Sequence, residues 1–487
     1  MFEVTDAQGQ PVEGVQIMAD AAAVGITDEA GILKTGALTS QVKTYTVQAV
    51  KGNQYSPALE FKVSPLAGSK VPFNINVGMG EDPTTSRMLN WHTDPATDGT
   101  VVELAKRSEF TDFDAPHVQK FNGASELYHT LDLGTVRVHK ATAAGLEPGT
   151  EYVYRVGDGQ GHYSAQGSFK TTELSGDTTK FLYFADSQAS TAKEFELWGN
   201  TIDKAAAEHP DAEFMVHAGD MVDKGFLEEQ WNYWFDEAQK HFLNTTLVSA
   251  IGNHEVMGSK ENGDFLAHFN QPGNGLNSLK GTNFSFDYKD VHFIMLNSEY
   301  QLEEQKKWLQ QDLANNTKEW TIAMFHRGPY GSIYDSAEVR SLWAPVLEEF
   351  GVDLVLNGHD HIYIRSYPMM NNQIAADGKG TTYVVAGSSG PKFYSHTERG
   401  WHEVVDEEKT QMYASIEVEG DELHYVTKTV DGRVVDEFTL AKSDTKPEPQ
   451  QIEVTPSQLT LAVGESQKLL AQVKPRRAER TVVWSVY

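Results

Sequence analysis

The sequence predicts a multi-domain protein in which two all-β sandwiches precede an α/β domain. The chain has 487 residues, which is too long for one hydrophobic core. Short alternating apolar stretches between turn signals fill its first part, as is typical of β-sandwiches. From about residue 178, apolar strand-like runs alternate with amphipathic segments, which indicates βαβ units.

The composition excludes several function classes. The formal net charge is −29, from 69 acidic and 40 basic residues; such a surface repels phosphate backbones, so we expect no nucleic-acid binding by a basic patch. The absence of cysteine excludes disulfides, thiolate metal sites and cysteine nucleophiles. No run of eighteen apolar residues occurs, so the sequence predicts no membrane span.

Residues 1–72 are predicted to form the first sandwich. Turn signals at Ala7–Pro11 and Asp28–Gly31 separate its short alternating strands. The stretch resembles the Ig-like or carboxypeptidase-regulatory-like modules of bacterial surface proteins. It carries no catalytic constellation, so we predict an Ig-like β-sandwich without a catalytic role.

Residues 73–174 are predicted to form the second sandwich. Trp91 lies in the alternating run 87–92 and is expected in the core. The turn Pro148–Gly149 leads into a strand whose first tyrosine, Tyr152, is placed to hydrogen-bond back across the corner. The stretch resembles a fibronectin type III domain. Purple acid phosphatases and their bacterial relatives carry such a domain directly before the catalytic domain.

Residues 175–442 are predicted to form the α/β domain, with sheets buried between helices. The expected strands are Phe181–Ala185, Phe214–Ala218, Leu247–Ile251, His292–Leu296, Thr321–Phe325, Val352–Leu356 and Tyr383–Ala386. The expected helices are Thr191–Glu208, Leu227–Leu243, Glu303–Ala314 and Ala337–Phe350.

The two ends of the chain predict its location. Residues 443–451 are predicted to be a linker, and residues 452–487 resemble the opening strands of a bacterial Ig-like module, which predicts a partial Ig-like domain. Met1 is followed at once by the strand-like Phe2–Val4, with no signal peptide visible. We expect a secreted or cell-surface protein whose signal peptide has been removed, with the Ig-like modules as candidates for cell-wall or surface association.

Five short polar motifs each follow an apolar run. They are Asp186-Ser187-Gln188, Gly219-Asp220, Gly252-Asn253-His254-Glu255, His326-Arg327-Gly328-Pro329 and Gly358-His359-Asp360-His361. Their ligand-type residues 186, 220, 253, 326 and 359 are 34, 33, 73 and 33 positions apart. Because one βαβ step takes ~30 or more residues, three intervals are single steps and one is about two. The motifs are thus expected at the carboxyl ends of successive strands, where α/β sheets place their sites.

These residue types indicate a metal site. Carboxylate, imidazole and amide oxygen form a borderline-hard donor set that suits Fe, Mn or Zn. Two metal ions that share one carboxylate need a central aspartate, and Asp220 is central in order and follows a permissive glycine. We predict that Asp186 and His361 complete the first metal. The ligands predicted for the second metal are Asn253, His326 and His359.

The two histidines of the last motif need a special backbone. His359 and His361 are two positions apart on an extended segment, so a local irregularity must turn both side chains inward. We expect the preceding Gly358 to allow that turn.

The combined motifs resemble the calcineurin-like metallophosphoesterase signature, Asp…Gly-Asp…Gly-Asn-His-Glu…His…Gly-His-x-His. The stretches Asn283–Tyr288, Gln305–Leu309 and Val385–Gly390 are similar to the purple-acid-phosphatase branch. The resemblance covers roughly residues 75 to 440. It implies a four-layer core, in which helices enclose a β-sandwich, and a binuclear centre of divalent or trivalent metal ions.

The resemblance also implies a reaction. A metal-activated hydroxide attacks the phosphorus of a small phosphomonoester or phosphodiester in line, without a phosphoenzyme. His254 adjoins the ligand Asn253 and is the candidate catalytic residue that protonates the leaving oxygen. Glu255 and Asp360 are candidates for orienting the imidazoles. Arg327 and Tyr330 are candidate substrate contacts, with a surface role as the alternative for either.

Two positions depart from the family pattern. Purple enzymes place a tyrosine ligand three residues after the second motif's aspartate, where this chain has Asp223. Other calcineurin-like enzymes use a histidine two residues after the first aspartate, where this chain has Gln188. Gln188 is one candidate replacement, through its amide oxygen, and a water molecule is the other. We predict a protein that is not purple and whose first metal is more exchangeable than the second.

A rival from another function class is a surface adhesion or wall-binding protein with an inactive metallophosphoesterase domain. Each motif residue alone is explained as simply by a helix cap, a turn or a core histidine. Five motifs at strand ends favour a site instead. Retention of His254 and of the second metal's ligands favours an enzyme.

Overall fold

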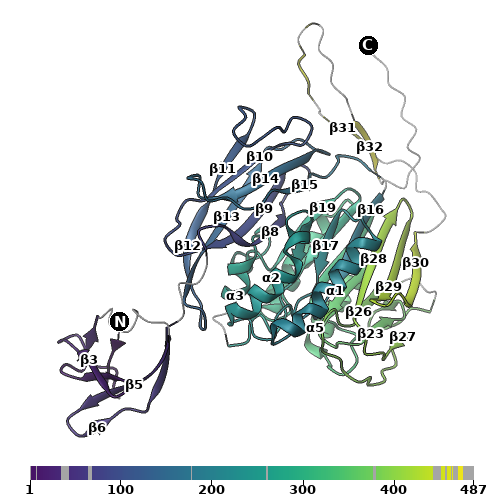
Figure 1. The fold of residues 1–487 in the computed structure, drawn as a ribbon. Coiled ribbons are helices and arrows are strands. Elements are labelled where there is room, and N and C mark those ends of the chain that lie inside the picture. Colours follow the sequence, from purple (N-terminus) through teal and green to yellow (C-terminus); the bar gives the residue numbers. More distant parts are fainter. Residues whose placement is uncertain are drawn as a thin grey trace.

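The computed structural model describes most of the chain (Figure 1). The described residues are 2–6, 8–34, 43–63, 69–176, 178–258, 262–376, 380–442, 451–455, 458–461, 463 and 470–474. Two β-rich units come first in the chain, and an α/β domain with two large sheets follows.

The first β-rich unit is built from short antiparallel strands around a small apolar core. Its strands are β1 (Phe2–Glu3), β2 (Gln16–Ala19), β3 (Ala22–Ile26), β4 (Ile32–Leu33), β5 (Lys43–Lys51), β6 (Gln54–Tyr55) and β7 (Leu59–Val63). One sheet has the order β3-β2-β5-β6 with β7 beside β5, and β1 pairs with β4. The core residues include Ile17 and Val47. The expected all-β character is confirmed, and the Ig-like layout stays a prediction.

The second β-rich unit packs two sheets around Trp91, which is fully buried. Its strands are β8 (Phe73–Met79), β9 (Ser86–Thr93), β10 (Val101–Lys106), β11 (Gln119–Asn122), β12 (Ala124–His129), β13 (Thr135–Ala144), β14 (Glu151–Gly157) and β15 (Gly167–Lys170). The hydroxyl oxygen of Tyr152 accepts a hydrogen bond from the Glu147 amide at 2.9 Å. The predicted core tryptophan and tyrosine corner are therefore present.

One sheet continues from this unit into the α/β domain. Its ten strands have the order β12-β13-β9-β8-β18-β17-β16-β28-β29-β30. The strands that follow β8 in this order are β18 (Thr246–Ser249), β17 (Phe214–His217), β16 (Thr178–Phe184), β28 (Met412–Glu419), β29 (Glu422–Thr429) and β30 (Val434–Ala441). The junction is a parallel pairing of β8 with β18, at Gly78 and Leu247. The predicted boundary between 174 and 175 thus separates two chain segments that share a sheet.

The second large sheet has seven strands, in the order β19-β20-β21-β22-β26-β23-β27. Their bounds are β19 (Phe284–Tyr288), β20 (Val291–Met295), β21 (Trp320–Arg327), β22 (Leu354–Gly358), β26 (Thr382–Ala386), β23 (Tyr363–Ser366) and β27 (His402–Asp406). Strands β20, β21, β22 and β26 are parallel, as are β16, β17 and β18. Parallel strands place their carboxyl ends at one edge of a sheet.

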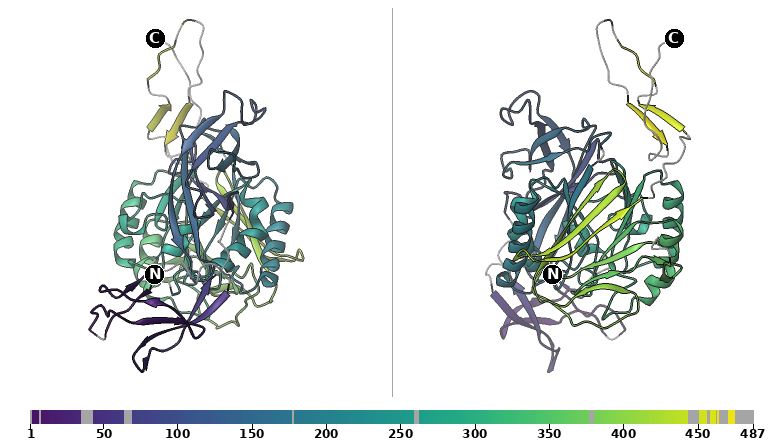
Figure 2. Two further views of the ribbon diagram at one scale, coloured as in Figure 1. Left: turned by 60° about the vertical axis from the view of Figure 1, so that its left-hand side comes forward. Right: turned by 90° about the vertical axis from the view of Figure 1, so that its right-hand side faces the viewer.

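Helices cover the outer faces of both sheets, which gives four layers (Figure 2). Helices α1 (Ala192–Glu208), α2 (Glu228–Phe242) and α3 (Gly263–His268) pack on the ten-stranded sheet. Helices α4 (Leu302–Asn315), α5 (Ala337–Leu342) and α6 (Ala344–Glu349) pack on the seven-stranded sheet. Between the sheets lies a core rich in aromatic side chains, such as Phe181, Phe214 and Phe293. The expected four-layer core is therefore observed.

The expected elements agree with the observed ones, with one correction. Each expected strand overlaps an observed one, and helix α1 begins at a capping box of Thr191 and Glu194. The single helix expected over Ala337–Phe350 is wrong, because the segment forms two short helices that meet at Trp343. Pro345 lies in the first turn of α6, where its missing N–H costs no hydrogen bond.

The remaining elements are short. They are the 3₁₀ helix η1 (Asn277–Leu279) and strands β24 (Met369–Met370), β25 (Gln373–Ile374), β31 (Gln451–Thr455) and β32 (Leu470–Lys474). Most of the predicted linker 443–451 and of the predicted partial Ig-like domain 452–487 lies outside the described residues. Among the described residues, no helix combines the length and apolar character that crossing a membrane requires.

Candidate active site

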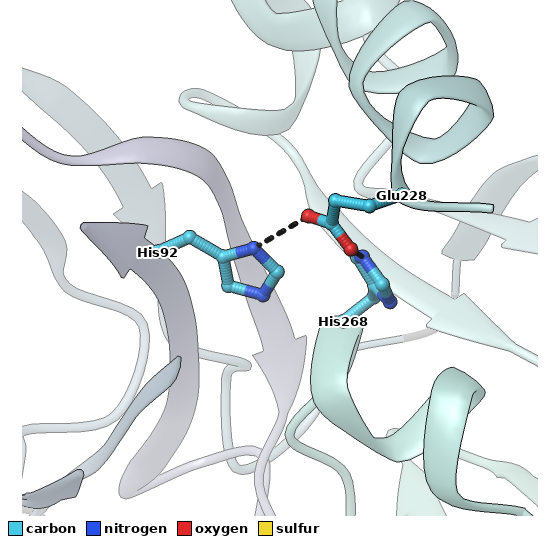
Figure 3. A group of neighbouring side chains, drawn as sticks. All are labelled: His92, Glu228 and His268. Carbon is cyan, nitrogen blue, oxygen red and sulfur yellow. Dashed lines mark hydrogen bonds and ion pairs between the residues drawn. The ribbon is translucent and has the colours of Figure 1, made fainter. Parts of the chain in front are cut away.

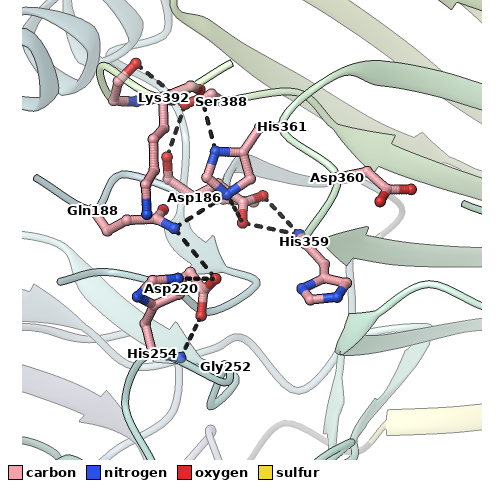
Figure 4. A network of polar contacts seen from close by, with 12 residues as sticks. Asp186, Gln188, Asp220, Gly252, His254, His359, Asp360, His361, Ser388 and Lys392 are labelled. Carbon is pink, nitrogen blue, oxygen red and sulfur yellow. Dashed lines mark hydrogen bonds and ion pairs between the residues drawn. The ribbon is translucent and has the colours of Figure 1, made fainter. Parts of the chain in front are cut away.

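The structure brings all eight predicted site residues to the carboxyl ends of the parallel strands. Figure 4 shows Asp186, Gln188, Asp220, His254, His359 and His361 among them. Asp186 and Gln188 follow β16, Asp220 follows β17, and His326 lies near the end of β21. The remaining four follow β18 and β22; they are Asn253, His254, His359 and His361. The spacing of the motifs predicts this convergence correctly.

Four of these residues have a left-handed backbone. The φ angles are +55° at Asp186, +55° at Asp220, +81° at His359 and +48° at His361. Non-glycine residues adopt this region at a cost of ~1–3 kcal/mol each, and such strain concentrates at functional sites. The expected irregularity at the two histidines is therefore present in the histidines themselves. Gly358 contributes differently: a Cβ there would lie 2.7 Å from Asp186 Oδ2, so its small size matters.

One group of ligand-type atoms surrounds the Nε2 atom of His326. That atom lies 3.1 Å from Asp220 Oδ2, 3.1 Å from Asn253 Oδ1 and 3.2 Å from His359 Nδ1. Asp220, His326 and His359 are buried, and their ligand atoms lie within 4.8 Å of one another. These are the residues predicted for the second metal.

A second group shares Asp220 with the first. Asp186, Asp220 and His361 are all buried, and their ligand atoms also lie within 4.8 Å of one another. The Nε2 atom of His361 is 3.4 Å from Asp186 Oδ1. Asp220 thus occupies the central position that the sequence predicts for a bridging carboxylate.

Gln188 lies between Asp220 and His361 of the second group (Figure 4). Its amide nitrogen is 3.3 Å from Asp220 Oδ2 and 3.1 Å from His361 Nε2, and its buried Oε1 has no hydrogen-bond partner among the described residues. The amide nitrogen therefore donates to both acceptors. A half-turn of the amide, which exchanges two atoms of similar size, places Oε1 there instead.

The ring nitrogens that face away from the groups fix the imidazole tautomers. His326 Nδ1 donates to Ala218 O at 2.9 Å, and His361 Nδ1 donates to Lys392 O at 3.2 Å. In neutral rings, the inward Nε2 atoms then carry lone pairs, and these lone pairs face carboxylates. Burial opposes charge on His326, yet the Asp220 carboxylate raises the pKa of that imidazole to about 10. Carboxylate and imidazole acceptors that converge in a buried position also fit metal cations.

Arg327 and Glu299 hold His359 from the opposite side. Arg327 Nη1 donates to His359 Nε2 at 3.1 Å, which holds the ring in place. A neutral ring that accepts this bond carries its hydrogen on Nδ1, so binding a metal through Nδ1 would require the other tautomer. The Arg327 guanidinium also forms hydrogen bonds to both oxygens of Glu299, at 2.8–3.1 Å. Arg327 therefore positions a histidine. Glu299, which the sequence does not single out, anchors this arginine.

Glu255 and Asp360 orient backbone rather than imidazoles. The buried Glu255 carboxylate accepts hydrogen bonds from the amides of Asp220, Met221 and Gly252, at 2.7–2.8 Å. Asp360 accepts hydrogen bonds from the amides of Ser332 and Tyr334. The expectation that the two carboxylates orient the histidines is therefore wrong. They instead accept hydrogen bonds from the backbone of the loops and so fix the shape of these loops.

The Glu255→Gln variant is expected to lose about 3 kcal/mol of unfolding free energy. The new amide NH₂ group would face backbone donors in a buried position, where an unmade hydrogen bond to a charged group costs about 1.5–3 kcal/mol. Urea denaturation measures the loss. Glu417→Gln, which alters a surface carboxylate 3.7 Å from Lys180, is the matched control and should change stability by about 0–1 kcal/mol. Equal stability of the two variants would contradict the role of Glu255.

His254 lies at the edge of the ligand groups. Its Nδ1 donates to the carbonyl oxygen of Asp223 at 2.6 Å, so Nε2 is free to face the site, 3.8 Å from Asp220 Oδ2. The side chain is 13% exposed, whereas that of Asp220 is 1% exposed. His254 can therefore reach a substrate that approaches from solvent.

The position expected for a tyrosine ligand is occupied by an ion pair. Asp223 Oδ1 lies 2.9 Å from Lys392 Nζ, and Asp223 Oδ2 accepts from Ser190 Oγ at 3.3 Å. These contacts lower the pKa of the Asp223 carboxyl against the opposing effect of burial. Lys392 therefore neutralises the Asp223 carboxylate, which occupies the position where purple enzymes have a tyrosine.

Comparison with known proteins agrees with this geometry. Residues 179–363 match the calcineurin-like phosphoesterase family, and residues 72–171 match the purple acid phosphatase N-terminal domain. Purple acid phosphatase 15 of Arabidopsis thaliana is 26% identical over 291 residues, which are 52% of this chain and 53% of that protein. The chain thus spans about half the length of this relative. Acid phosphatase type 7 of Mus musculus is 25% identical over 368 residues, 64% of this chain and 80% of that protein.

A solved structure shows the same fold. Purple acid phosphatase PPD1 from yellow lupin (Lupinus luteus) seeds matches with a TM-score of 0.67 and 17% sequence identity, over 82% of this chain and 80% of that chain. The chain therefore carries a calcineurin-like phosphoesterase domain over residues 179–363, and members of that family are metal-dependent phosphoester hydrolases. A purple acid phosphatase N-terminal domain precedes it over residues 72–171, and the relatives that the chain matches include purple acid phosphatases. The fibronectin type III layout of that domain stays a prediction.

The iron-loaded protein is expected to lack the intense tyrosinate charge-transfer band of purple enzymes. The reason is that Asp223, held by Lys392, stands where those enzymes place a tyrosine. Visible absorption of the iron-loaded protein checks this. An Asp223→Tyr variant is the matched control, because it returns the phenol. An intense band in the unaltered protein would refute the prediction.

Proposed function

We propose that this chain hydrolyses small phosphate esters at the site between Asp186 and His361, outside the cell. The observation that carries the proposal is the pair of buried ligand groups that share Asp220. The predicted ligands of the first metal are Asp186, Gln188, Asp220 and His361. Those of the second are Asn253, Asp220, His326 and His359.

Bound metal ions would supply Lewis acidity, which acidifies a water molecule and neutralises charge on phosphoryl oxygens. The protein's own contribution is to position the donors. Glu255 fixes the Asp220 loop, and Arg327 fixes the ring of His359. Both groups are buried, so the site has few competing waters and its electrostatic interactions are strong.

His254 is the proposed proton donor to the leaving oxygen. Its Nδ1 is occupied by the Asp223 carbonyl, so a proton is delivered from Nε2. Partial exposure allows the ring to take up a proton from solvent between turnovers.

A cavity of about 400 Å³ beside His359 supports a small-molecule substrate. Its lining includes Ser298, Arg327 and Tyr334 next to His359. The ring of Tyr334 lies 4.4 Å from that of His359, measured between centroids. We propose that the organic group of a phosphomonoester or phosphodiester occupies this cavity, while its phosphoryl group lies at the two ligand groups.

Turnover of para-nitrophenyl phosphate and of its bis ester, with added Mn, Zn or Fe, tests the proposal. Activity with either ester supports an enzyme, and the ratio of the two separates monoesterase from diesterase. The rival is a surface adhesion or wall-binding protein with an inactive domain. No turnover with any metal, together with no bound metal by elemental analysis, would favour that rival.

A further inference from the structure

A third group of ligand-type side chains shares no residue with the candidate active site (Figure 3). His92 belongs to β9, Glu228 is the first residue of α2, and His268 is the last residue of α3. All three side chains are fully buried. His92 Nδ1 lies 3.1 Å from Glu228 Oε1, and His268 Nε2 lies 3.1 Å from Glu228 Oε2.

The other ring nitrogens of both histidines are committed to backbone carbonyls. His92 Nε2 is 2.9 Å from Ala267 O, and His268 Nδ1 is 2.7 Å from Asp264 O. A carbonyl oxygen only accepts, so each of these nitrogens carries the ring hydrogen. In neutral rings the two inward nitrogens are then lone pairs, and they face a carboxylate that also only accepts. Three acceptors meet in the protein interior, and a cation among them removes the conflict.

Protons satisfy these acceptors less well than a metal ion does. One proton leaves the other imidazole with its lone pair toward the carboxylate. Two protons make two imidazolium rings, with centroids 4.8 Å apart, out of contact with water. Buried like charges at this distance are costly, because neither is solvated. A single divalent ion binds the lone pairs of both imidazoles and of the carboxylate at once.

The surroundings have the features of a metal site. Metal-binding histidines characteristically donate their second ring N–H to a backbone carbonyl, as both histidines do here. The ring of Trp231 stacks on that of His268, with centroids 4.2 Å apart and planes 14° apart, which fixes the imidazole. The three ligand atoms lie within 4.8 Å of one another.

We propose that His92, Glu228 and His268 bind a structural zinc-type divalent cation, separate from the catalytic pair. Two imidazoles and one carboxylate are a donor set that zinc accepts, with the second Glu228 oxygen or one water to complete the coordination. Full burial leaves no room for a substrate, so the ion is structural. The ion would join β9 of the second β-rich unit to helices α2 and α3 of the α/β domain. A hydrogen bond from the Glu228 amide to Asp132 Oδ1, at 3.0 Å, links the same two units.

Metal content of a full-length variant that lacks two of the catalytic ligands, one of them the shared Asp220, tests the proposal. The Asp186→Asn, Asp220→Asn double variant is prepared with zinc, dialysed and measured by elemental analysis. We expect one retained zinc ion per chain and a Tm that rises with added zinc. Adding Glu228→Gln to the double variant should abolish both the retained zinc ion and the rise in Tm. Adding Glu437→Gln, which removes a surface carboxylate 3.3 Å from His424, is the matched control and should retain the ion.

Two results would overturn the proposal. One is a double variant that retains no zinc and whose Tm does not respond to zinc. The other is retention of the ion after Glu228→Gln. If the Glu228 variant fails to fold, cobalt substitution of the double variant decides instead. A visible absorption spectrum typical of low-coordinate cobalt, with imidazole neighbours by X-ray absorption, supports the site, and a spectrum of hydrated cobalt refutes it.

Discussion

Replacing Asp220 by asparagine is expected to lower kcat/KM for phosphate esters by about 10³-fold or more. Asp220 is the residue common to both ligand groups, so the change weakens both metals at once. A loss of several kcal/mol of charge stabilisation corresponds to about three decades in rate. Steady-state kinetics and elemental analysis on the same preparation measure the loss of rate and of metal.

The control for this variant is a surface aspartate. Asp211→Asn removes an ion pair with Lys180 at 2.8 Å, away from the strand ends that carry the ligands, and should leave both kinetics and metal content unchanged. Near-normal activity of the Asp220 variant would contradict the bridging role.

The His254→Ala variant is expected to lose activity according to the leaving group. A general acid contributes about 10²–10⁴-fold when the leaving oxygen is strongly basic. The loss should therefore approach that range for an alkyl phosphate. It should be much smaller for para-nitrophenyl phosphate, whose leaving group needs little protonation. Kinetics with a series of esters of graded leaving-group pKa measures the dependence.

Metal content separates this role from ligation. His254 is not among the atoms around His326 Nε2 or His361 Nε2, so the His254→Ala variant should bind as much metal as the unaltered protein. An equal loss for all esters, or a loss of metal, would contradict a proton-donor role.

The positions of the candidate ligands could be predicted because each follows an apolar strand. The sequence intervals between Asp186, Asp220 and Asn253 correspond to single βαβ steps, and parallel strands bring such residues to one edge. The observed arrangement of the ligands differs from the predicted one only in local backbone detail. The turn at His359 and His361 is made by their own left-handed backbones and not by a left-handed Gly358.

The supporting contacts could not be predicted, because they join residues without any regular spacing. Glu299 reaches Arg327 from a loop after β20, and only the fold shows that this pair fixes His359. The same applies to His92, which is 136 positions from Glu228 in sequence and in direct contact with it. Such groups have no signature, since their partners come from different units of the chain.

The pairing of β8 with β18 limits how the protein can be divided. A fragment that begins at the predicted boundary, residue 175, would keep β18 but lose the strand that hydrogen-bonds to it at Gly78. β18 would then become the open edge of the large sheet, and exposed edges promote association between molecules. Leu243, which follows α2, would also lose the buried side chains of β8 and β9 against which it packs. A fragment for expression should therefore begin before Phe73, so that β8 and β9 stay with the sheet that carries the candidate site.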